Sequence, residues 1–325
     1  CIIPGKIRIT GFAAECIHAA ALILKGEGRT MRFGALEAGG TKMVCAVGNE
    51  KGEILDRVSI PTETPDITMP KLLEYFQGQS VEALGIGCFG PVDLDPASGT
   101  YGFITTTPKL AWRNCDICGY FRERLKVPVG FDTDVNGSML GEATWGCARG
   151  LDTAIYITVG TGVGVGVLAG GRLLHGMQHP EGGHILLPRR ADDAYEGKCP
   201  YHKTCMEGLA AGPAIEARWG KKAAELSDRP EVWELEAHYL AYAITNYMMI
   251  LSPQKIILGG GVMHQEQLMP LIRKKVTDML GGYIQTEALS DMDSYIVPAS
   301  LNDNQGILGA LKLGMDAKSA AEACS

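Results

Sequence analysis

The sequence lacks any tract of clustered Lys and Arg, and its net charge is −7. It is therefore a poor match for a nucleic-acid-binding protein, which needs a basic surface. No apolar run is long enough to span a bilayer. The longest candidates, Ile155–Leu168 and Tyr247–Leu258, are interrupted by Gly, Thr, Pro or Lys, so we expect buried strands or core helices there. The phosphate-binding pattern GxxxxGK[ST] is also missing, which excludes a P-loop kinase.

Ten cysteines in 325 residues are too dilute for a disulfide scaffold and favour a reducing compartment, the cytoplasm. The length and the 46% hydrophobic content fit one large or two medium globular domains. A regular strand pattern begins only at Met31. We therefore expect residues 1–30 to be a non-native or disordered extension outside the working fold, although Ala13–Leu24 could form a short helix.

Two β-hairpins with glycine turns are predicted about 120 residues apart. The four runs with strand composition are 32–36, 42–47, 154–159 and 164–169. The first pair is joined at Gly39-Gly40 and the second at Gly160-Thr161-Gly162. This weak internal repeat, set among helical segments, predicts an α/β protein of two similar lobes with a ligand cleft between them.

The glycine turns are candidate phosphate-binding sites, because backbone amides can approach phosphate oxygens where no Cβ intervenes. In the first turn Thr41 adds a hydroxyl and Lys42 a cation. Each turn alone could equally be a plain hairpin. A third glycine run, Gly259–Gly261, follows a buried strand and would let a flat group press against the backbone, or would simply join a strand to a helix.

A carboxylate pair precedes the helix predicted for Val135–Thr144. Phosphoryl transfer to an alcohol needs a carboxylate that accepts the hydroxyl proton, and Asp134 or Asp132 could serve. The alternative is helix N-capping, for which Asp is well suited. Asn136 adds a polar group able to hold a sugar hydroxyl.

The most specific chemical signal is a set of two histidines and two cysteines: His184, Cys199, His202 and Cys205. Two thiolates and two imidazoles suit a tetrahedral zinc ion that is structural, because no coordination position stays open. The alternative is incidental core cysteines and surface histidines. Such a zinc would staple a loop too polar to form its own core, and would fix Glu181 and Glu207 near one place.

A second cysteine pair, Cys115 and Cys118, has no histidine close by in the sequence. We interpret these two residues as packing residues of a helix region.

Together these motifs resemble the ROK sugar kinases over residues 31–315. The motifs that carry the resemblance are Glu37–Lys42, Asp134–Asn136, Gly160–Gly164, Glu181–His184 and Cys205–Glu207. Two further stretches resemble the bacterial zinc-containing fructokinase branch: Cys199–His202, and Thr107–Lys109 with Trp112.

The resemblance implies a two-lobed, actin-like ATPase (ribonuclease H-like) fold with a central cleft and a zinc-stapled loop. It implies an N-terminal lobe of residues 31–145, completed by a C-terminal helix at 304–320, and a C-terminal lobe of residues 146–303 with a zinc loop at 184–205. It also implies a homodimer that converts ATP and D-fructose to fructose 6-phosphate, with Asp134 as the general base.

The resemblance also assigns binding roles. The implied phosphate-binding residues are Gly39, Gly40, Thr41, Lys42, Gly160, Thr161 and Gly162, with Gly259, Gly260 and Gly261 facing the adenosine. The implied sugar-binding residues are Gly90, Pro91, Asp93, Asn136, Glu181, His184 and Glu207. Glu37 is a candidate Mg²⁺ ligand, although the wider family commonly has Asp there. The wider family also often has a third cysteine where this chain has His202.

Two alternatives stay open. One is a kinase for another hexose, such as glucose or mannose, because discrimination between similar sugars rests on a few hydrogen bonds that spacing does not reveal. The other is a sugar-responsive transcriptional regulator built on the same fold. It is disfavoured because residues 1–30 are too short and not basic enough for a DNA-binding domain.

Overall fold

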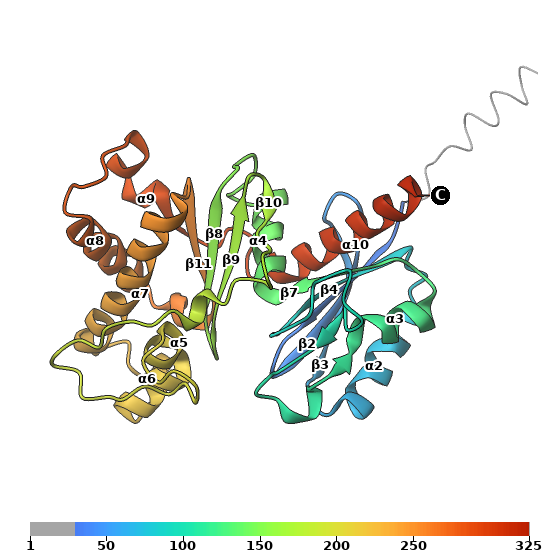
Figure 1. The fold of residues 1–325 in the computed structure, drawn as a ribbon, viewed down its shortest axis with the longest axis horizontal. Coiled ribbons are helices and arrows are strands. Elements are labelled where there is room, and N and C mark those ends of the chain that lie inside the picture. The colour runs from blue at the N-terminus through green and yellow to red at the C-terminus, as the bar shows by residue number, and fades with distance from the viewer. Residues whose placement is uncertain (1–29, 325) are drawn as a thin grey trace, which may run out of the picture. The chain divides into compact units, whose positions relative to one another are not determined.

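The computed structural model describes residues 30–324. The expectations for the segment before residue 30, including the helix at Ala13–Leu24, lie outside the described residues. The working fold is the unit that begins at Arg32, and it contains two five-stranded sheets (Figure 1). Among residues 30–324, no helix is both long enough and apolar enough to cross a bilayer.

The first sheet has the strand order β3-β2-β1-β4-β7. Its strands are β1 (Phe33–Ala38), β2 (Lys42–Gly48), β3 (Ile54–Pro61), β4 (Ala83–Cys88) and β7 (Val129–Thr133). The first three are antiparallel neighbours, whereas β4 runs parallel to β1 and β7. A small ribbon joins β5 (Phe103–Ile104) to β6 (Cys115–Asp116).

Helices cover both faces of this sheet. The helices are α2 (Pro65–Gln77), α3 (Ile117–Leu125) and α10 (Gln305–Ala323). Alternate residues of β1 explain the two layers, since successive side chains of a strand point to opposite faces. Leu36 packs in the core formed with α2 and α3, whereas Ala35 packs in the core formed with α10.

The second sheet repeats this plan with the order β10-β9-β8-β11-β12. Its strands are β8 (Ala154–Val159), β9 (Val163–Ala169), β10 (Arg172–Leu173), β11 (Lys255–Gly259) and β12 (Ile296–Pro298). Again an antiparallel hairpin borders strands that run parallel. The predicted internal repeat is therefore present as two sheets of matching strand order, and the predicted α/β class is confirmed.

One face of the second sheet carries most of the remaining helices. They are α5 (Met206–Ala210), α6 (Gly212–Trp219), α7 (Pro230–Leu251), α8 (Leu268–Leu280) and α9 (Met292–Tyr295). The short 3₁₀ turns are η1 (Leu110–Trp112), η2 (Gly182–His184), η3 (Ala223–Glu225), η4 (Gly261–His264) and η5 (Glu287–Ser290). Ile155 and Ile157 of β8 pack in the large core beneath α7 and α8.

Helix α4 (Asp134–Thr144) lies between the two sheets. Val135 and Met139 pack against Tyr156 of β8, while the opposite face of α4 packs against α10. Glycine makes the helix–helix approach possible, because a Cβ on Gly309 of α10 would overlap the carbonyl oxygen of Gly137. The lobe limits at 145/146 and 303/304 stay predictions, but α10 does pack on the first sheet.

Helices α5 and α6 follow each other with a break of one residue. The chain forms α5 and α6, separated at Ala211, whose ψ of 155° is extended. Two local features explain the break. Pro213 at the start of α6 has no amide to continue a helix, and the Gly212 amide instead donates to Gly160 O at 2.8 Å. The break brings Gly212 and Pro213 beside the second glycine turn.

Candidate functional site

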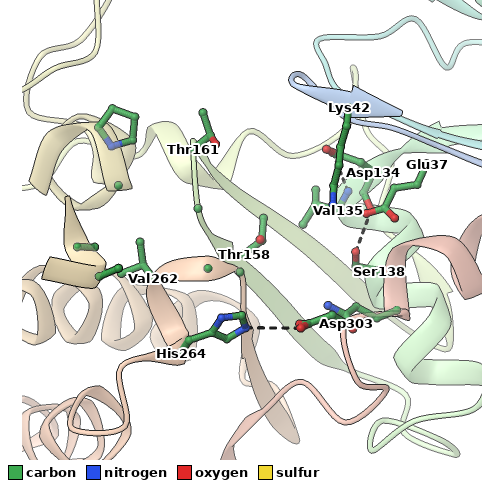
Figure 2. Close-up of a pocket in the computed structure, with 18 of the residues that line it drawn as sticks. Glu37, Lys42, Asp134, Val135, Ser138, Thr158, Thr161, Val262, His264 and Asp303 are labelled. Carbon is green, nitrogen blue, oxygen red and sulfur yellow. Dashed lines mark hydrogen bonds and ion pairs between the residues drawn. The ribbon is translucent and has the colours of Figure 1, made fainter. Parts of the chain in front are cut away.

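A cavity of about 780 Å³ is lined by residues from both sheets and from α4 (Figure 2). We call it the central cavity. Its lining includes Glu37, Lys42, Asp134, Ser138, Tyr156, Gly160, Thr161, Gly212, Pro213, Glu216, Lys222, Gly260, Gly261, His264, Asp303 and Gln305. Charged groups, hydroxyls and bare glycine backbone thus meet in one place, as in a polar ligand site.

The first glycine turn borders the central cavity through the residues that flank it. Lys42 lines the cavity, and Figure 2 shows it on the same side as Asp134. The turn itself is tied to the neighbouring strand, since Gly39 O accepts a 2.7 Å hydrogen bond from Thr62 and Thr41 O accepts one from the Thr62 amide. Gly40 passes close to Lys109: a Cβ there would lie 2.9 Å from Lys109 Cε.

The second glycine turn faces the cavity directly through Gly160 and Thr161. A 2.9 Å bond from the Gly160 amide to Gly162 O closes this turn. Gly162 itself faces Glu207, because a Cβ at Gly162 would lie 2.7 Å from Glu207 Oε2. The structure thus brings a predicted phosphate-binding turn against a predicted sugar-binding carboxylate.

The third glycine run has two cavity-facing members, Gly260 and Gly261. Gly260 has φ of 91°, a conformation that favours glycine, and a Cβ there would overlap Val159 O. Gly259 has a different environment. A Cβ at Gly259 would collide with the Tyr156 hydroxyl, so close packing explains that glycine.

The structure distinguishes the two aspartates before α4. The N-cap is Thr133, whose hydroxyl accepts a 3.1 Å bond from the Asn136 amide, so the capping interpretation of the aspartates is wrong. Asp132 is 3% exposed, and its carboxylate is held by Asn136 Nδ2 at 2.7 Å and by His175 Nε2 at 2.8 Å. Asp134 instead lines the central cavity.

Asp134 has the electrostatics of a weakly acidic carboxyl group. Burial raises its pKa from 3.8 to about 6, although its Oδ1 also accepts a 2.8 Å bond from the Val135 amide that favours the charged form. The pKa of Glu37 is raised to about 7, first by burial and then by the charge of Asp134. Two nearby carboxylates of raised pKa in a cleft are typical of a functional site.

Glu37 lies beside the start of α10, where a Cβ on Gly306 would overlap its carboxylate. The neighbouring cations Arg57 and Lys42 partly offset the rise of its pKa. The arrangement gives the cavity a pair of oxygen donors, Glu37 and Asp134, next to Lys42. Carboxylate oxygens are ligands that Mg²⁺ prefers.

A second acidic group lies next to Asp134. Burial, then the charges of Glu207 and Asp134, raise the pKa of Glu181 to about 7. Glu207 accepts a 3.1 Å bond from the Val163 amide, and its other oxygen is 3.9 Å from His184 Nε2. A Cβ on Gly90 would lie 3.6 Å from Glu181, which brings the loop after β4 to the same place.

Three other predicted sugar-binding residues have different surroundings. Asn136 is 1% exposed, and its Oδ1 has no hydrogen-bond partner among the described residues. Pro91 O accepts bonds from the amide and the hydroxyl of Thr105. Asp93 is held within its own loop by the hydroxyls of Ser98 and Thr100, which lower its pKa.

The four predicted zinc ligands do come together. The donor atoms of His184, Cys199, His202 and Cys205 all lie within 4.8 Å of one another. His184 Nδ1 is 3.4 Å from Cys205 Sγ and 3.8 Å from Cys199 Sγ. Zinc bonds of about 2.3 Å to sulfur and about 2.0 Å to nitrogen place tetrahedral neighbours roughly 3.3–3.8 Å apart, so these residues fit the ion.

The other cysteine pair behaves as expected for packing residues. Cys118 is fully buried in the core of the first sheet, and Cys115 packs against that core. Burial raises the pKa of both thiols.

Sequence reasoning missed several residues that the fold brings to the site. His264 and Asp303, 3.6 Å apart, meet across the cavity from η4 and the segment before α10. His175 bonds to Asp132 of β7, and His179 bonds to Val92 in the loop after β4, near the predicted sugar-binding residues. Both precede Glu181 within six residues, and this proximity was the only signal in the sequence.

Comparison with known proteins identifies the family of the chain. The ROK family model matches residues 33–317, and the chain belongs to the ROK family. A fructokinase from Pediococcus pentosaceus is 45% identical over 287 residues, covering 88% of this chain and 99% of that protein. A Bacillus subtilis protein, whose own fructokinase name is provisional, is 54% identical over 88% of this chain and 96% of that protein.

A solved structure gives the same result for the fold. The ROK hexokinase from Thermus thermophilus has a TM-score of 0.72 and 27% identity, and the alignment covers 89% of this chain and all of that one. The predicted fold, that of the ROK sugar kinases, is confirmed.

Proposed function

We propose that this chain is an ATP-dependent fructokinase that converts D-fructose to fructose 6-phosphate. The observation that carries the proposal is the position of Asp134. It lies in the same cavity as Gly160, Thr161, Gly260 and Gly261, and its pKa of about 6 suits a base that operates near neutral pH.

Asp134 accepts the proton of the primary hydroxyl as that oxygen attacks the γ-phosphorus. A new oxygen–phosphorus bond forms while the bond to the ADP oxygen breaks, so the phosphoryl group moves and ADP leaves. Backbone amides at the glycine turns, with Lys42, stabilise the negative charge of the transferring group. Magnesium, for which Glu37 is the proposed protein ligand, would neutralise charge on the phosphates.

The proposed ATP subsite combines the three glycine runs. The phosphates of ATP would lie between two turns: the turn 39–42 of the first sheet and the turn 160–162 of the second sheet. The adenosine lies against Gly260 and Gly261, where the backbone is bare. Gly259 contributes indirectly, through its packing on Tyr156.

The proposed sugar subsite is acidic. Glu181, Glu207, Asn136 and the loop from Gly90 to Asp93 provide the hydroxyl partners, with His184 at the boundary between this subsite and the zinc site. Support comes from the Coulombic effect of Glu207 and Asp134 on Glu181, which requires the three carboxylates to lie near one another.

Zinc is proposed to hold the loop 184–205 and, through His184 and Cys205, to fix the positions of Glu181 and Glu207. Zinc would supply a structural staple here, since His184, Cys199, His202 and Cys205 would provide four protein ligands. The carboxylate of Glu207, 3.9 Å from His184 Nε2, is placed to orient that ligand from outside the shell.

The choice of fructose rests on the Pediococcus pentosaceus relative, whose name gives this activity, together with the fit of the zinc quartet. The thiols of the described residues are all free, which supports work in a reducing compartment, the cytoplasm. A homodimer completes the proposal.

The direct test is a coupled ADP-release assay over fructose, glucose, mannose and N-acetylmannosamine, with Mg²⁺ present or removed. Fructose should give the highest kcat/KM, and removal of Mg²⁺ should abolish turnover. A higher kcat/KM for glucose or mannose would assign the chain to that hexose. Specific DNA binding without turnover of any hexose would identify a regulator instead.

A further inference from the structure

The segment from Leu174 to Glu181 links the two sheets at two histidines. It follows β10 of the second sheet, yet His175 bonds to a strand of the first sheet and His179 to the loop that follows β4 of that sheet. His175 Nε2 is 2.8 Å from Asp132 Oδ2 at the end of β7. His179 Nε2 accepts a 3.2 Å hydrogen bond from the Val92 amide, beyond the end of β4.

The hydrogen bonds of His179 determine which ring nitrogen carries its proton. Because Nε2 accepts the Val92 amide, Nε2 has no proton, and the neutral ring carries its proton on Nδ1. The side chain is 3% exposed, and burial lowers its pKa, so the neutral form agrees with the surroundings. Nδ1 lies 3.5 Å from Glu181 Oε1, and the backbone of Pro180 is a further hydrogen-bond partner of the ring.

The ring therefore lies between two parts of the proposed sugar subsite. On one side is the loop Gly90–Val92: a Cβ on Gly90 would lie 3.3 Å from His179 Cε1. On the other side is Glu181, whose side chain is 45% exposed. Among the described residues, no hydrogen bond holds its carboxylate from another direction.

We propose that His179 is a positioning residue that sets sugar affinity and specificity, by fixing the Glu181 carboxylate against the Gly90–Val92 loop. This inference rests on the proposed function, since it names how that sugar subsite is held together. His179 acts through Glu181 and the loop, and not on the γ-phosphate or on Asp134. Its loss should therefore weaken sugar binding far more than nucleotide binding.

Two conservative substitutions separate the two contacts of the ring. In His179→Asn the side-chain amide replaces the Nδ1 end, so the contact with Glu181 is kept and the Val92 amide loses its acceptor. In His179→Gln the terminal amide replaces the Nε2 end, so the Val92 bond is kept and Glu181 loses its partner. His179→Leu removes both contacts at similar volume. His238→Asn, on α7 and away from the central cavity, is the matched control.

The experiment measures kcat, the KM for fructose and the KM for ATP for the wild type and the four variants, with the Tm of each. We expect the KM for fructose to rise about tenfold in each conservative variant and about a hundredfold in His179→Leu, because His179→Asn leaves the buried Val92 amide unpaired and His179→Gln frees the half-exposed Glu181 carboxylate. The KM for ATP should change by less than about twofold. His238→Asn should match the wild type.

The results separate the two proposals. If the wild type phosphorylates no hexose, the proposed function is wrong, and the sugar role of His179 is overturned with it. If the wild type is active but the KM for fructose is unchanged in all three His179 variants, only the inference is overturned. Equal changes in both KM values together with a lower Tm would show a general structural role and would also overturn the inference.

Discussion

Asp134→Asn is expected to lower the activity of the protein and to raise its stability. The amide keeps the shape of the side chain and its Oδ1 acceptor for the Val135 amide, which is 2.8 Å away. The helix N-cap is Thr133 and is untouched. The substitution therefore removes the charge and the proton acceptor of the central cavity while leaving the local fold intact.

The effect on activity follows from the role of a general base, whose removal lowers turnover by about 10²–10⁴-fold. The effect on stability follows from the pKa. The folded state raises the pKa of Asp134 from 3.8 to about 6, so the folded protein binds the proton more tightly than the unfolded chain. Stability thus falls as pH rises from about 4 to about 6. Above that range the destabilisation caused by burying the ionised carboxylate is fully present.

The shift of about two pKa units corresponds to about 3 kcal/mol at neutral pH, and the part of the carboxylate that faces the cavity is screened, which reduces this to about 1–2 kcal/mol. Asp134→Asn should therefore raise the Tm by a few degrees at pH 7.5. The measurements are ADP release and thermal unfolding, with fructose binding by calorimetry as the control for an intact sugar subsite. Turnover within tenfold of the wild type, or a lower Tm, would refute this reasoning.

Three further predictions address the pH profile, the zinc site and the helix contact. The kcat/KM for fructose should fall about tenfold per pH unit below about pH 6, because the raised pKa of Asp134 leaves it protonated there, and a profile flat down to pH 5 would contradict its role as base. One zinc ion per chain should be found by elemental analysis, and Cys199→Ser should lose zinc and lower the Tm, whereas Cys324→Ser, on an exposed thiol, should do neither. Gly309→Ala should cost about 2 kcal/mol or more in chemical denaturation, because its Cβ would overlap Gly137 O, while Gly99→Ala, with open space around its Cβ, should stay within about 0.5 kcal/mol of the wild type.

Local signals in the sequence were sufficient for the hairpins and the metal ligands. The turns at Gly39-Gly40 and Gly160–Gly162 punctuate alternating strands, and strand pairing across a short turn depends on residues that are adjacent in the chain. The zinc quartet has a similar origin, because three of its four members lie within seven residues and metal chemistry admits few residue types.

Contacts between distant segments decided the rest. The residue pattern alone left Asp132 and Asp134 as candidates and only the family resemblance favoured Asp134, whereas the packing shows that Asp132 is held by Asn136 and by His175, 43 residues away. The break between α5 and α6 depends partly on a bond from the Gly212 amide to Gly160, 52 residues earlier. Neither partner can be identified from local propensity.

By itself the sequence determined the α/β class and the repeated hairpins, and it predicted the histidine–cysteine quartet and the residues proposed for the phosphate and sugar subsites. The tertiary structure decided which aspartate faces the cavity, how Glu37 and Glu181 gain their raised pKa values, and that His179 lies between Glu181 and the loop after β4. The physical reason is that desolvation and hydrogen-bond geometry depend on atoms from both sheets at once, whereas turn chemistry and ligand type are properties of short stretches of chain.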